Sequence, residues 1–446
     1  MTLKAPPVQV AVDTNGTKLS VPWQQWFWQL YQQLASPSMQ SVYFGDSTDL
    51  DAFGRLRVST PTTLFASTQY YTSDTLHVEN YVAGTATATY TQATASTTLS
   101  TVAATSGNRA LRQTKVYWRY QPGKSQLVLI TGTLAKSGIP VGGAYAGIGY
   151  YDDANGVYFR RDVNGYSLVI RTSTSGSVVE TIIPQSQWND PMNGTGVSGI
   201  TIDFTKEQIF IIDLQWLGVG RVRFSLNVNG TIVPVHAVNH ANLTTAVYMQ
   251  SANLPVRFEV NNVTAGSAIS VECICISIQS EGGVSNEGGY SFECDNANSP
   301  KSVANTATLT PVMSLRCQDT WQGVTFRGHL SPITINMLAQ TNPVYWEWVW
   351  NGTLTGATFA PVSASNSGAE FDTAATAISG GISLSSGFVL ASGSGSNVVG
   401  VASHNAPERL ILARTYANVR DVLTLCARGL GGAATLYATI NYEEQH

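Results

Sequence analysis

Residues 205–242 read TKEQIFIIDLQWLGVGRVRFSLNVNGTIVPVHAVNHAN, and this stretch decides the fold that the sequence predicts. Apolar and polar side chains alternate from Arg221 to Val228, which is the period of a strand with one buried face. Residues 208–216 are apolar at most positions on both faces, so we expect that strand to be covered on both sides. Asn229-Gly230 predicts a tight hairpin to a third strand at 231–238. The pattern predicts an antiparallel meander that forms the central hairpin of a β-sandwich.

The first turn of this meander contains two glycines, Gly218 and Gly220. We expect these glycines to allow positive φ in the turn, since glycine has no Cβ to clash there. Four apolar side chains of the middle strand should share one face, namely Val222, Phe224, Leu226 and Val228. Burying each of them contributes roughly 1.5–3 kcal/mol, so the meander is predicted to be a folding core.

The composition favours a structural or adhesive protein. The chain has 446 residues, enough for two or three domains, but only 12% of them are charged. That is about half the usual share, so the surface must consist largely of Ser, Thr, Asn, Gln and Gly. Adhesins, fibres and capsid-type proteins have such neutral surfaces. The net charge of −4 and the lack of a basic block argue against nucleic-acid binding.

Targeting and redox signals are weak. No apolar run approaches the roughly 18–20 residues needed to span a bilayer, and the N-terminus has no apolar core of signal-peptide type. We therefore expect a protein made in the cytoplasm, without membrane insertion, that leaves by assembly or lysis. The chain has five cysteines, namely Cys273, Cys275, Cys294, Cys317 and Cys426. Their spacing does not match that of metal ligands, so we interpret them as reduced, buried thiols.

Changes in composition predict three parts. Residues 1–66 comprise a polar arm, a helix and a turn-rich connector. Residues 67–280 hold short, evenly spaced strand patterns of an antiparallel β-sandwich or jelly roll. A glycine-rich linker then opens a second, smaller β-sandwich over 281–446. Within the first sandwich, the Thr/Ala-rich segment 67–108 predicts weakly specified strands or an arm that pairs with another chain. The fold class is therefore all-β with a short N-terminal helix.

The predicted helix covers residues 21–35, VPWQQWFWQLYQQLA, and Pro22 suits its first turn. Its apolar stripe consists of Trp23, Trp26, Phe27, Leu30, Tyr31 and Leu34. So short a helix cannot fold alone. It either packs on its own domain or docks aromatic side chains into a neighbouring subunit, because aromatics dominate interface energetics. The docking hypothesis names Trp23, Trp26, Phe27, Trp28, Leu30 and Tyr31 as interface residues.

The best candidates for glycan contact lie in one loop, at Asp152, Asp153 and Asn155. Carboxylates in such loops are typical of glycosidases and of calcium-dependent lectins. Two adjacent aspartates on a strand point to opposite faces, so they cannot form the facing pair that glycoside hydrolysis needs. We therefore predict contact with a glycan at most, and no catalytic residue.

Other clusters also favour structural roles. His236 and His240 could share one face but have no evident third zinc ligand, so we interpret them as hydrogen-bonded polar residues. Three aspartates do not follow the EF-hand pattern and predict Asx turns instead, namely Asp46, Asp49 and Asp51. The Gly-Lys-Ser at 123–125 lacks the first glycine of a phosphate loop. The tryptophans of 346–350 are expected in a core or a subunit interface. We predict no cofactor and no metal.

Two stretches carry a resemblance to a known fold family. They are NGVYFRRDVNGYSLVIRTSTSG at 155–176 and QIFIIDLQWLGVGRVRFSLNVNGTIV at 208–233. The region from about 130 to 275 resembles the concanavalin-like lectin sandwich, a jelly roll of two antiparallel sheets. The metal-ligand pattern of that family has no match in these residues, so the resemblance implies no metal site here.

Four further stretches resemble virion proteins of tailed bacteriophages: PWQQWFWQLYQQL at 22–34, DAFGRLRVSTPTTLF at 51–65, YQPGKSQ at 120–126 and WLGVGRVRF at 216–224. This resemblance implies a non-enzymatic virion subunit, tail-associated or fibre-like, made in the host cytoplasm. Its expected partners are further copies of the chain in a homo-oligomer (a trimer), other virion proteins and a host-surface glycan. A capsid-decorating or head-fibre protein and a carbohydrate-binding or glycan-degrading protein remain alternatives.

Overall fold

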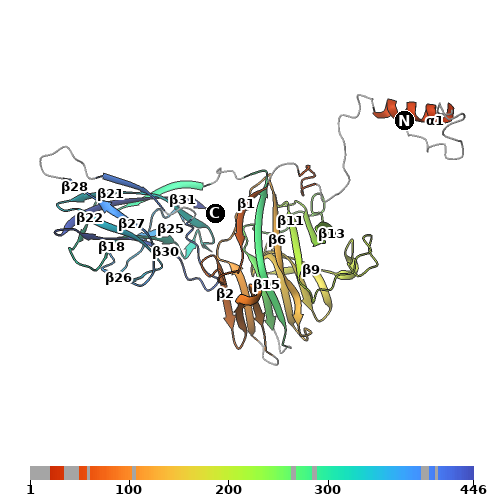
Figure 1. Cartoon of the computed structure of the whole chain (residues 1–446), viewed down its shortest axis with the longest axis horizontal. Coiled ribbons are helices and arrows are strands. Elements are labelled where there is room, and N and C mark those ends of the chain that lie inside the picture. The colour runs from red at the N-terminus through yellow and green to blue at the C-terminus, as the bar shows by residue number, and fades with distance from the viewer. Residues whose placement is uncertain are drawn as a thin grey trace. The chain divides into compact units, whose positions relative to one another are not determined.

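The computed structural model describes residues 21–34, 50–57, 61–102, 107–262, 268–283, 289–392, 401–406 and 410–446. The chain divides into two compact units, residues 1–50 and 51–446. The first contains helix α1 (Val21–Leu34), and the second is built from strands (Figure 1). The predicted fold class, two antiparallel sandwiches and a short N-terminal helix, is confirmed. Among the described residues no helix has the length and hydropathy of a membrane span.

Strands β1 to β15 form the first sandwich, whose two sheets enclose one hydrophobic core. The eight-stranded sheet has the order β13-β12-β11-β6-β15-β4-β3, with β1 also paired to β15. Its strands are β1 (Thr62–Ser67), β3 (Thr87–Thr91), β4 (Ser96–Ser100), β6 (Ser125–Ser137), β11 (Gln208–Leu214), β12 (Val222–Val228), β13 (Thr231–Val238) and β15 (Ser270–Glu281).

The seven-stranded sheet has the order β10-β9-β8-β7-β14-β5-β2 and is antiparallel throughout. Its strands are β2 (Val78–Ala83), β5 (Asn108–Thr114), β7 (Ala144–Tyr151), β8 (Gly156–Asp162), β9 (Gly165–Thr172), β10 (Val179–Pro184) and β14 (Val256–Asn262). Two short 3₁₀ helices, η1 (Gln92–Thr94) and η2 (Gln185–Gln187), lie between strands.

The predicted meander is present as β11, β12 and β13, with Ile212 opposite Phe224. Asn229 and Gly230 both have positive φ, 53° and 85°, as a two-residue hairpin of type I′ requires. The meander is not central, however. Strand β13 forms one edge of the eight-stranded sheet. The middle of this sheet is formed by β6 and β15, which are separated by more than a hundred residues in the sequence. A local pattern identifies strands, but non-local pairing decides their order.

The first turn of the meander uses its glycines in two different ways. Leu217 and Gly218 have positive φ, but Gly220 does not. A Cβ built on Gly220 would lie 2.1 Å from the carbonyl oxygen of Gln215, and the Gly220 N–H donates to the carbonyl of Trp216 at 2.7 Å. Gly220 is therefore needed for close backbone approach, and the expected positive φ at this position is wrong.

The described part of the Thr/Ala-rich segment, residues 67–102 and 107–108, pairs within its own chain. Strand β4 lies between β15 and β3 in the eight-stranded sheet, and β2 pairs with β5 in the other sheet. Thr97 and Leu99 of β4 are buried, so the segment contributes to the sandwich core instead of projecting as an arm. Hydrogen bonding to β15 supplies the register that the repetitive sequence leaves undefined.

The second sandwich, like the first, consists of two sheets around one core, but here each sheet has six strands. One sheet contains β16 (Gly289–Asp295), β17 (Lys301–Val303), β21 (His329–Gln340), β28 (Ala391–Ser392), β29 (Val401–Asn405) and β31 (Ala434–Gln445). The other contains β18 (Thr310–Cys317), β22 (Val344–Trp350), β24 (Ala360–Pro361), β25 (Ala369–Asp372), β27 (Ile382–Val389) and β30 (Val422–Gly429). Two small ribbons pair β19 (Thr320–Trp321) with β20 (Val324–Thr325) and β23 (Thr353–Thr355) with β26 (Ala377–Ser379).

Strand β22 places three tryptophans in the core of the second sandwich, namely Trp346, Trp348 and Trp350. Their spacing of two puts them on one face, and the structure resolves the alternative between core and subunit interface in favour of the core. All five cysteines are free thiols, four of them buried and Cys275 partly buried.

His329 at the start of β21 makes the stability of the second sandwich depend on pH. Burial lowers the pKa of this imidazole from 6.5 to about 4, although a hydrogen bond with Gln445 acts in the opposite direction. Between pH 6.5 and 4 the unfolded chain binds a proton at this position and the folded chain does not. Stability should therefore fall as the pH drops through this window, by up to about 3 kcal/mol from His329.

Urea unfolding of the wild type and of His329→Gln between pH 7.5 and 4 measures this contribution, which the variant should lack. His77→Gln is the control. The hydrogen bond with Asp74 raises the pKa of His77, although burial acts in the opposite direction, so replacing His77 should change the pH dependence of stability in the opposite sense. An identical pH dependence of His329→Gln and the wild type would contradict the prediction.

Candidate functional site

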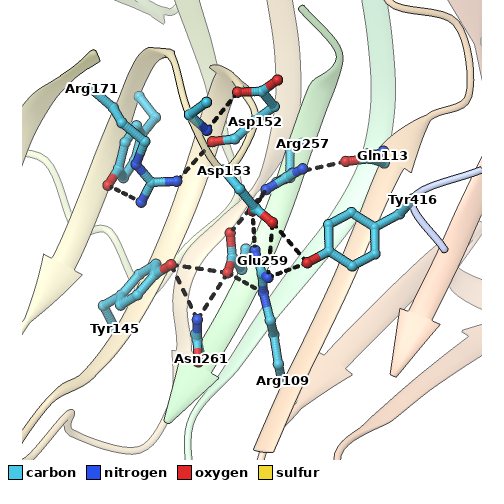
Figure 2. A network of polar contacts seen from close by, with 12 residues as sticks. Arg109, Gln113, Tyr145, Asp152, Asp153, Arg171, Arg257, Glu259, Asn261 and Tyr416 are labelled. Carbon is cyan, nitrogen blue, oxygen red and sulfur yellow. Dashed lines mark hydrogen bonds and ion pairs between the residues drawn. The ribbon is translucent and has the colours of Figure 1, made fainter. Parts of the chain in front are cut away.

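The outer face of the seven-stranded sheet carries a network of polar and aromatic side chains. Along β14, Val256, Phe258 and Val260 enter the core, so the intervening residues face outward. Figure 2 shows how these outward residues meet groups from β5, β7 and the second sandwich. We define the polar network as the residues labelled there: Arg109, Gln113, Tyr145, Asp152, Asp153, Arg171, Arg257, Glu259, Asn261 and Tyr416.

Glu259 lies at the centre of the polar network and is fully buried. Its Oε1 accepts hydrogen bonds from Arg109 Nε at 2.7 Å, Tyr145 Oη at 2.9 Å and Asn261 Nδ2 at 3.2 Å. Its Oε2 lies 3.7 Å from Arg257 Nη1. Burial by itself raises the pKa of Glu259, but the charges of Arg109 and Arg257 outweigh burial, so the pKa is lower than its ordinary value.

Asp153 is the second carboxylate of the polar network, and its side chain is 49% exposed. Its Oδ1 accepts hydrogen bonds from Arg109 Nη2 and Arg257 Nη1, both at 2.6 Å. Burial by itself also raises the pKa of Asp153, but the two arginines lower it by more. The pKa of Asp153 therefore lies well below the ordinary range of aspartate. Each arginine thus contacts both carboxylates, and the two positive charges balance the two negative ones.

Tyr416 extends the polar network into the second sandwich. Its Oη donates to Asp153 Oδ2 at 2.7 Å and accepts from Arg109 Nη1 at 2.5 Å. Its backbone N–H donates to Glu79 Oε1 at 2.7 Å, and its ring lies 4.6 Å from that of Tyr81. One tyrosine therefore connects the second sandwich to strands β2 and β5 and to the turn after β7.

A layer of tyrosine rings covers the sheet beside Glu259. The rings of Tyr151 and Tyr158 stack with centroids 4.1 Å apart, and the Arg171 guanidinium lies 5.4 and 5.1 Å from them. Glycine lies beneath these rings, because a Cβ on Gly149 would lie 2.4 Å from Tyr158 Cβ and one on Gly147 2.6 Å from Tyr151 Oη. The glycines of GAYAGIGYY thus make room for aromatic side chains on the outer face.

The three loop residues predicted to contact a glycan have separate roles in the turn after β7. Asp152 Oδ1 accepts the backbone N–H groups of Ala154 at 2.8 Å and Asn155 at 2.7 Å. Asn155 is buried, and its Oδ1 accepts the N–H of Gln250 at 3.0 Å. Of the three side chains, only that of Asp153 pairs with the arginines of the network. Their contact with a glycan stays a prediction.

The other candidate residues are engaged in local hydrogen bonds. His236 Nδ1 accepts the N–H of Asn189 at 3.1 Å, and His240 Nδ1 donates to the carbonyl of Gly220 at 2.7 Å. Asp51 Oδ1 accepts the N–H groups of Phe53 and Arg55, both at 2.9 Å. Asp46 and Asp49 lie outside the described residues. Within the described ranges no three His, Cys, Asp or Glu side chains gather as metal ligands would.

The polar network holds its charges in place, and its two carboxylates are poorly suited to donate a proton. A general acid needs a pKa near the working pH, whereas both carboxylates have pKa values below their ordinary range. Sequence patterns alone did not point to Glu259, Arg257 or Tyr416. Strand β14 contained a usable signal, because RFEVN places charged and polar residues on one face of an otherwise apolar strand.

No protein-family model matches the chain, and a search of curated proteins finds no match. Similar solved structures include a β-glucanase of Bacillus licheniformis, at 12% identity over 49% of this chain and 99% of that chain, with a TM-score of 0.28. Peanut lectin matches at 12% identity over 50% of this chain and 98% of the lectin chain, with a TM-score of 0.31. A carbohydrate esterase from Shiga toxin-encoding bacteriophage phi24B matches at 9% identity over 49% of this chain and 99% of the esterase chain, with a TM-score of 0.27. At these values the likenesses say nothing about what this chain binds.

Proposed function

We propose that this chain is a non-enzymatic structural subunit of a tailed-bacteriophage virion, tail-associated or fibre-like, that docks through helix α1 and presents its sandwiches to the host surface. The observation that carries the proposal is the aromatic surface of α1 in a unit separate from residues 51–446. Trp28 is 60% exposed and Phe27 is also exposed. Large exposed aromatics on a short helix are typical of a segment that is buried by a partner.

The ring geometry of α1 supports docking as one patch. Trp23 and Trp26 meet edge to face with centroids 5.9 Å apart, and Trp26 lies 5.1 Å from Phe27 in the same manner. Leu30 is half-buried, while the side chain of Tyr31 lies outside the described residues. Because a fourteen-residue helix is marginal alone, a partner surface that covers these rings would also stabilise the helix.

The second unit supports a structural role through the way its two sandwiches are joined. The polar network pairs two arginines with two carboxylates across β5, β14 and the turn after β7, and Tyr416 brings in the second sandwich. Such a joint resists bending between the sandwiches. Carboxylates that stay ionised are also poor proton donors, which supports a non-enzymatic function over a glycan-degrading one.

Self-assembly is part of the proposal, with a homo-oligomer, a trimer, as the expected form. Among the described strands β27 pairs only with β22, so its other side is a sheet edge. Phe388 on this strand and Leu390 just after it are exposed, and residues 382–390 contain no charge and no proline. An edge without charged or proline residues is a surface on which another chain can pair.

Incorporation into virions tests the docking function. Replacing Trp26 and Trp28 together by alanine should reduce the amount of the subunit on assembled particles about tenfold or more, since aromatic hot spots contribute about 2 kcal/mol or more each. Quantitative mass spectrometry of purified virions measures this. The matched control is Gln25→Ala with Gln29→Ala, which changes exposed polar positions of the same helix. Equal incorporation of the two double variants would overturn the docking role.

A further inference from the structure

The loop between β1 and β2 presents two neighbouring tyrosines to solvent. We define the tyrosine loop as residues 68–77, TQYYTSDTLH. Tyr70 is 66% exposed and Tyr71 is 81% exposed. Their rings meet edge to face with centroids 4.6 Å apart. Two large aromatic side chains this exposed, side by side, form a surface whose function neither core packing nor the polar network explains.

The first half of the tyrosine loop is fixed by a buried glutamine. Gln69 precedes the pair and is buried, with its Nε2 donating to the carbonyls of Cys273 at 2.7 Å and Ile274 at 2.9 Å. Its Oε1 accepts the Thr97 hydroxyl at 2.5 Å. Tyr90 Oη donates to the Gln69 carbonyl at 2.7 Å. The backbone that carries Tyr70 is therefore tied to β15, β4 and β3.

The second half of the tyrosine loop is fixed by a buried arginine. Arg112 on β5 is almost completely buried, and its guanidinium donates to the Ser73 carbonyl and, at 2.9 Å, to Asn80 Oδ1. Asp74 accepts a hydrogen bond from the Ser67 hydroxyl and pairs with His77 Nδ1 at 2.7 Å. The loop is thus held on both sides of its tyrosines.

A rigid loop with exposed tyrosines is pre-organised for binding. Tyrosine offers a large amphipathic surface at a low cost in conformational entropy, and a fixed backbone removes the further cost of ordering the loop. The buried polar side chains of Gln69 and Arg112 maintain this loop geometry, and the surface they support is the tyrosine pair.

The surroundings of the pair select an uncharged ligand. Residues 61–80 contain no lysine or arginine, and the Asp74 carboxylate, whose side chain is 18% exposed, is already paired with His77. The exposed neighbours Thr68, Thr72 and Thr75 offer hydroxyls. Two tyrosines provide roughly 300–500 Å² of contact surface, well below the roughly 800 Å² per partner of a stable protein interface. A sugar ring, with an apolar C–H face and hydroxyls at its rim, matches this surface in size and polarity.

We propose that the tyrosine loop binds a neutral glycan, with Tyr70 and Tyr71 stacking on the sugar rings and the threonine hydroxyls bonding to the ring hydroxyls. This inference rests on the proposed function, in which it supplies the contact with the host surface. It also places that contact away from the turn of Asp152, Asp153 and Asn155.

Binding of the full chain to immobilised neutral polysaccharides tests the inference, with dextran, mannan, galactan and a β-1,3-glucan as probes. The wild type should bind at least one probe, and Tyr70→Ala with Tyr71→Ala should weaken that binding about tenfold or more. Tyr71→Phe should retain most of the binding, because stacking needs the ring and not its hydroxyl. Tyr290→Ala is the matched control, since Tyr290 is 68% exposed on β16 of the second sandwich.

Three results of the polysaccharide assay would overturn the inference: no binding of any probe by the wild type, unchanged binding by the double variant, or an equal loss in Tyr290→Ala. Binding of host envelopes that protease treatment abolishes and deglycosylation does not would identify a protein partner and also overturn it. Should the double variant unfold, Tyr71→Ala alone decides, as this side chain is the more exposed. Virion incorporation of the tyrosine variants should equal that of the wild type, so failure here is distinguishable from failure of α1 docking.

Discussion

Glu259→Gln should lower the free energy of unfolding of the wild-type chain by about 3–5 kcal/mol. The variant keeps the shape of the side chain but removes the fully buried negative charge that Arg109 and Arg257 share. Arg257 is itself fully buried, so it would lose a counter-charge without gaining water. Breaking one member of a buried ion-pair network costs more than the net value of the network, because the remaining charge is left uncompensated.

Urea unfolding followed by tryptophan fluorescence measures the change for Glu259→Gln. The matched control is Glu293→Gln on β16, an exposed glutamate whose replacement should change stability by about 0.5 kcal/mol or less. Replacing both charges, as in Arg257→Met with Glu259→Leu, should destabilise less than the sum of the two single changes. A loss below about 1 kcal/mol in Glu259→Gln would show that the two arginines are satisfied without this carboxylate.

Tyr416→Ala should separate the unfolding of the two sandwiches. This side chain joins the loop of the second sandwich to Asp153, Arg109 and Tyr81 of the first. Removing it deletes a hydrogen bond to each of two charged groups and an aromatic contact, together worth about 3 kcal/mol or more. With that coupling lost, differential scanning calorimetry should resolve two transitions where the wild type shows one cooperative transition.

Two further variants make the Tyr416 experiment specific. Tyr416→Phe keeps the ring beside Tyr81 and removes only the hydroxyl, so it should give an intermediate result. Val419→Ala alters an exposed residue of the same loop and should leave a single transition. One unchanged transition in Tyr416→Ala would mean that other contacts, such as Arg327 with Tyr117, couple the sandwiches sufficiently.

Local patterns predicted the strands well. The alternation from Arg221 to Val228 and the Asn229-Gly230 hairpin appear as expected, because both depend on side-chain period and backbone preference over a few residues. The helix at Val21–Leu34 follows for the same reason. The role of Gly220 could not be predicted in this way, since a close approach to the Gln215 carbonyl is indistinguishable in sequence from a need for positive φ.

Most residues of the candidate site could not be predicted from the sequence. The sequence predicts a glycan contact at Asp152, Asp153 and Asn155, which stays a prediction, but it did not predict the arginine partners of Asp153. Arg109 and Glu259 are 150 residues apart, and Asp153 and Tyr416 are 263 apart. No spacing rule connects such positions, because their meeting depends on which strands pair and on how the second sandwich packs.

The sequence by itself determined the all-β class, the strand faces, the aromatic helix and the neutral surface of this protein. The reason is that each of these depends on residue type and on a short period. Only the tertiary structure decided that β6 and β15 form the middle of the eight-stranded sheet, that Tyr416 reaches the polar network, and that Gln69 and Arg112 hold the tyrosine loop. These features depend on contacts between distant segments, whose free energies are gained only when the whole sandwich is formed.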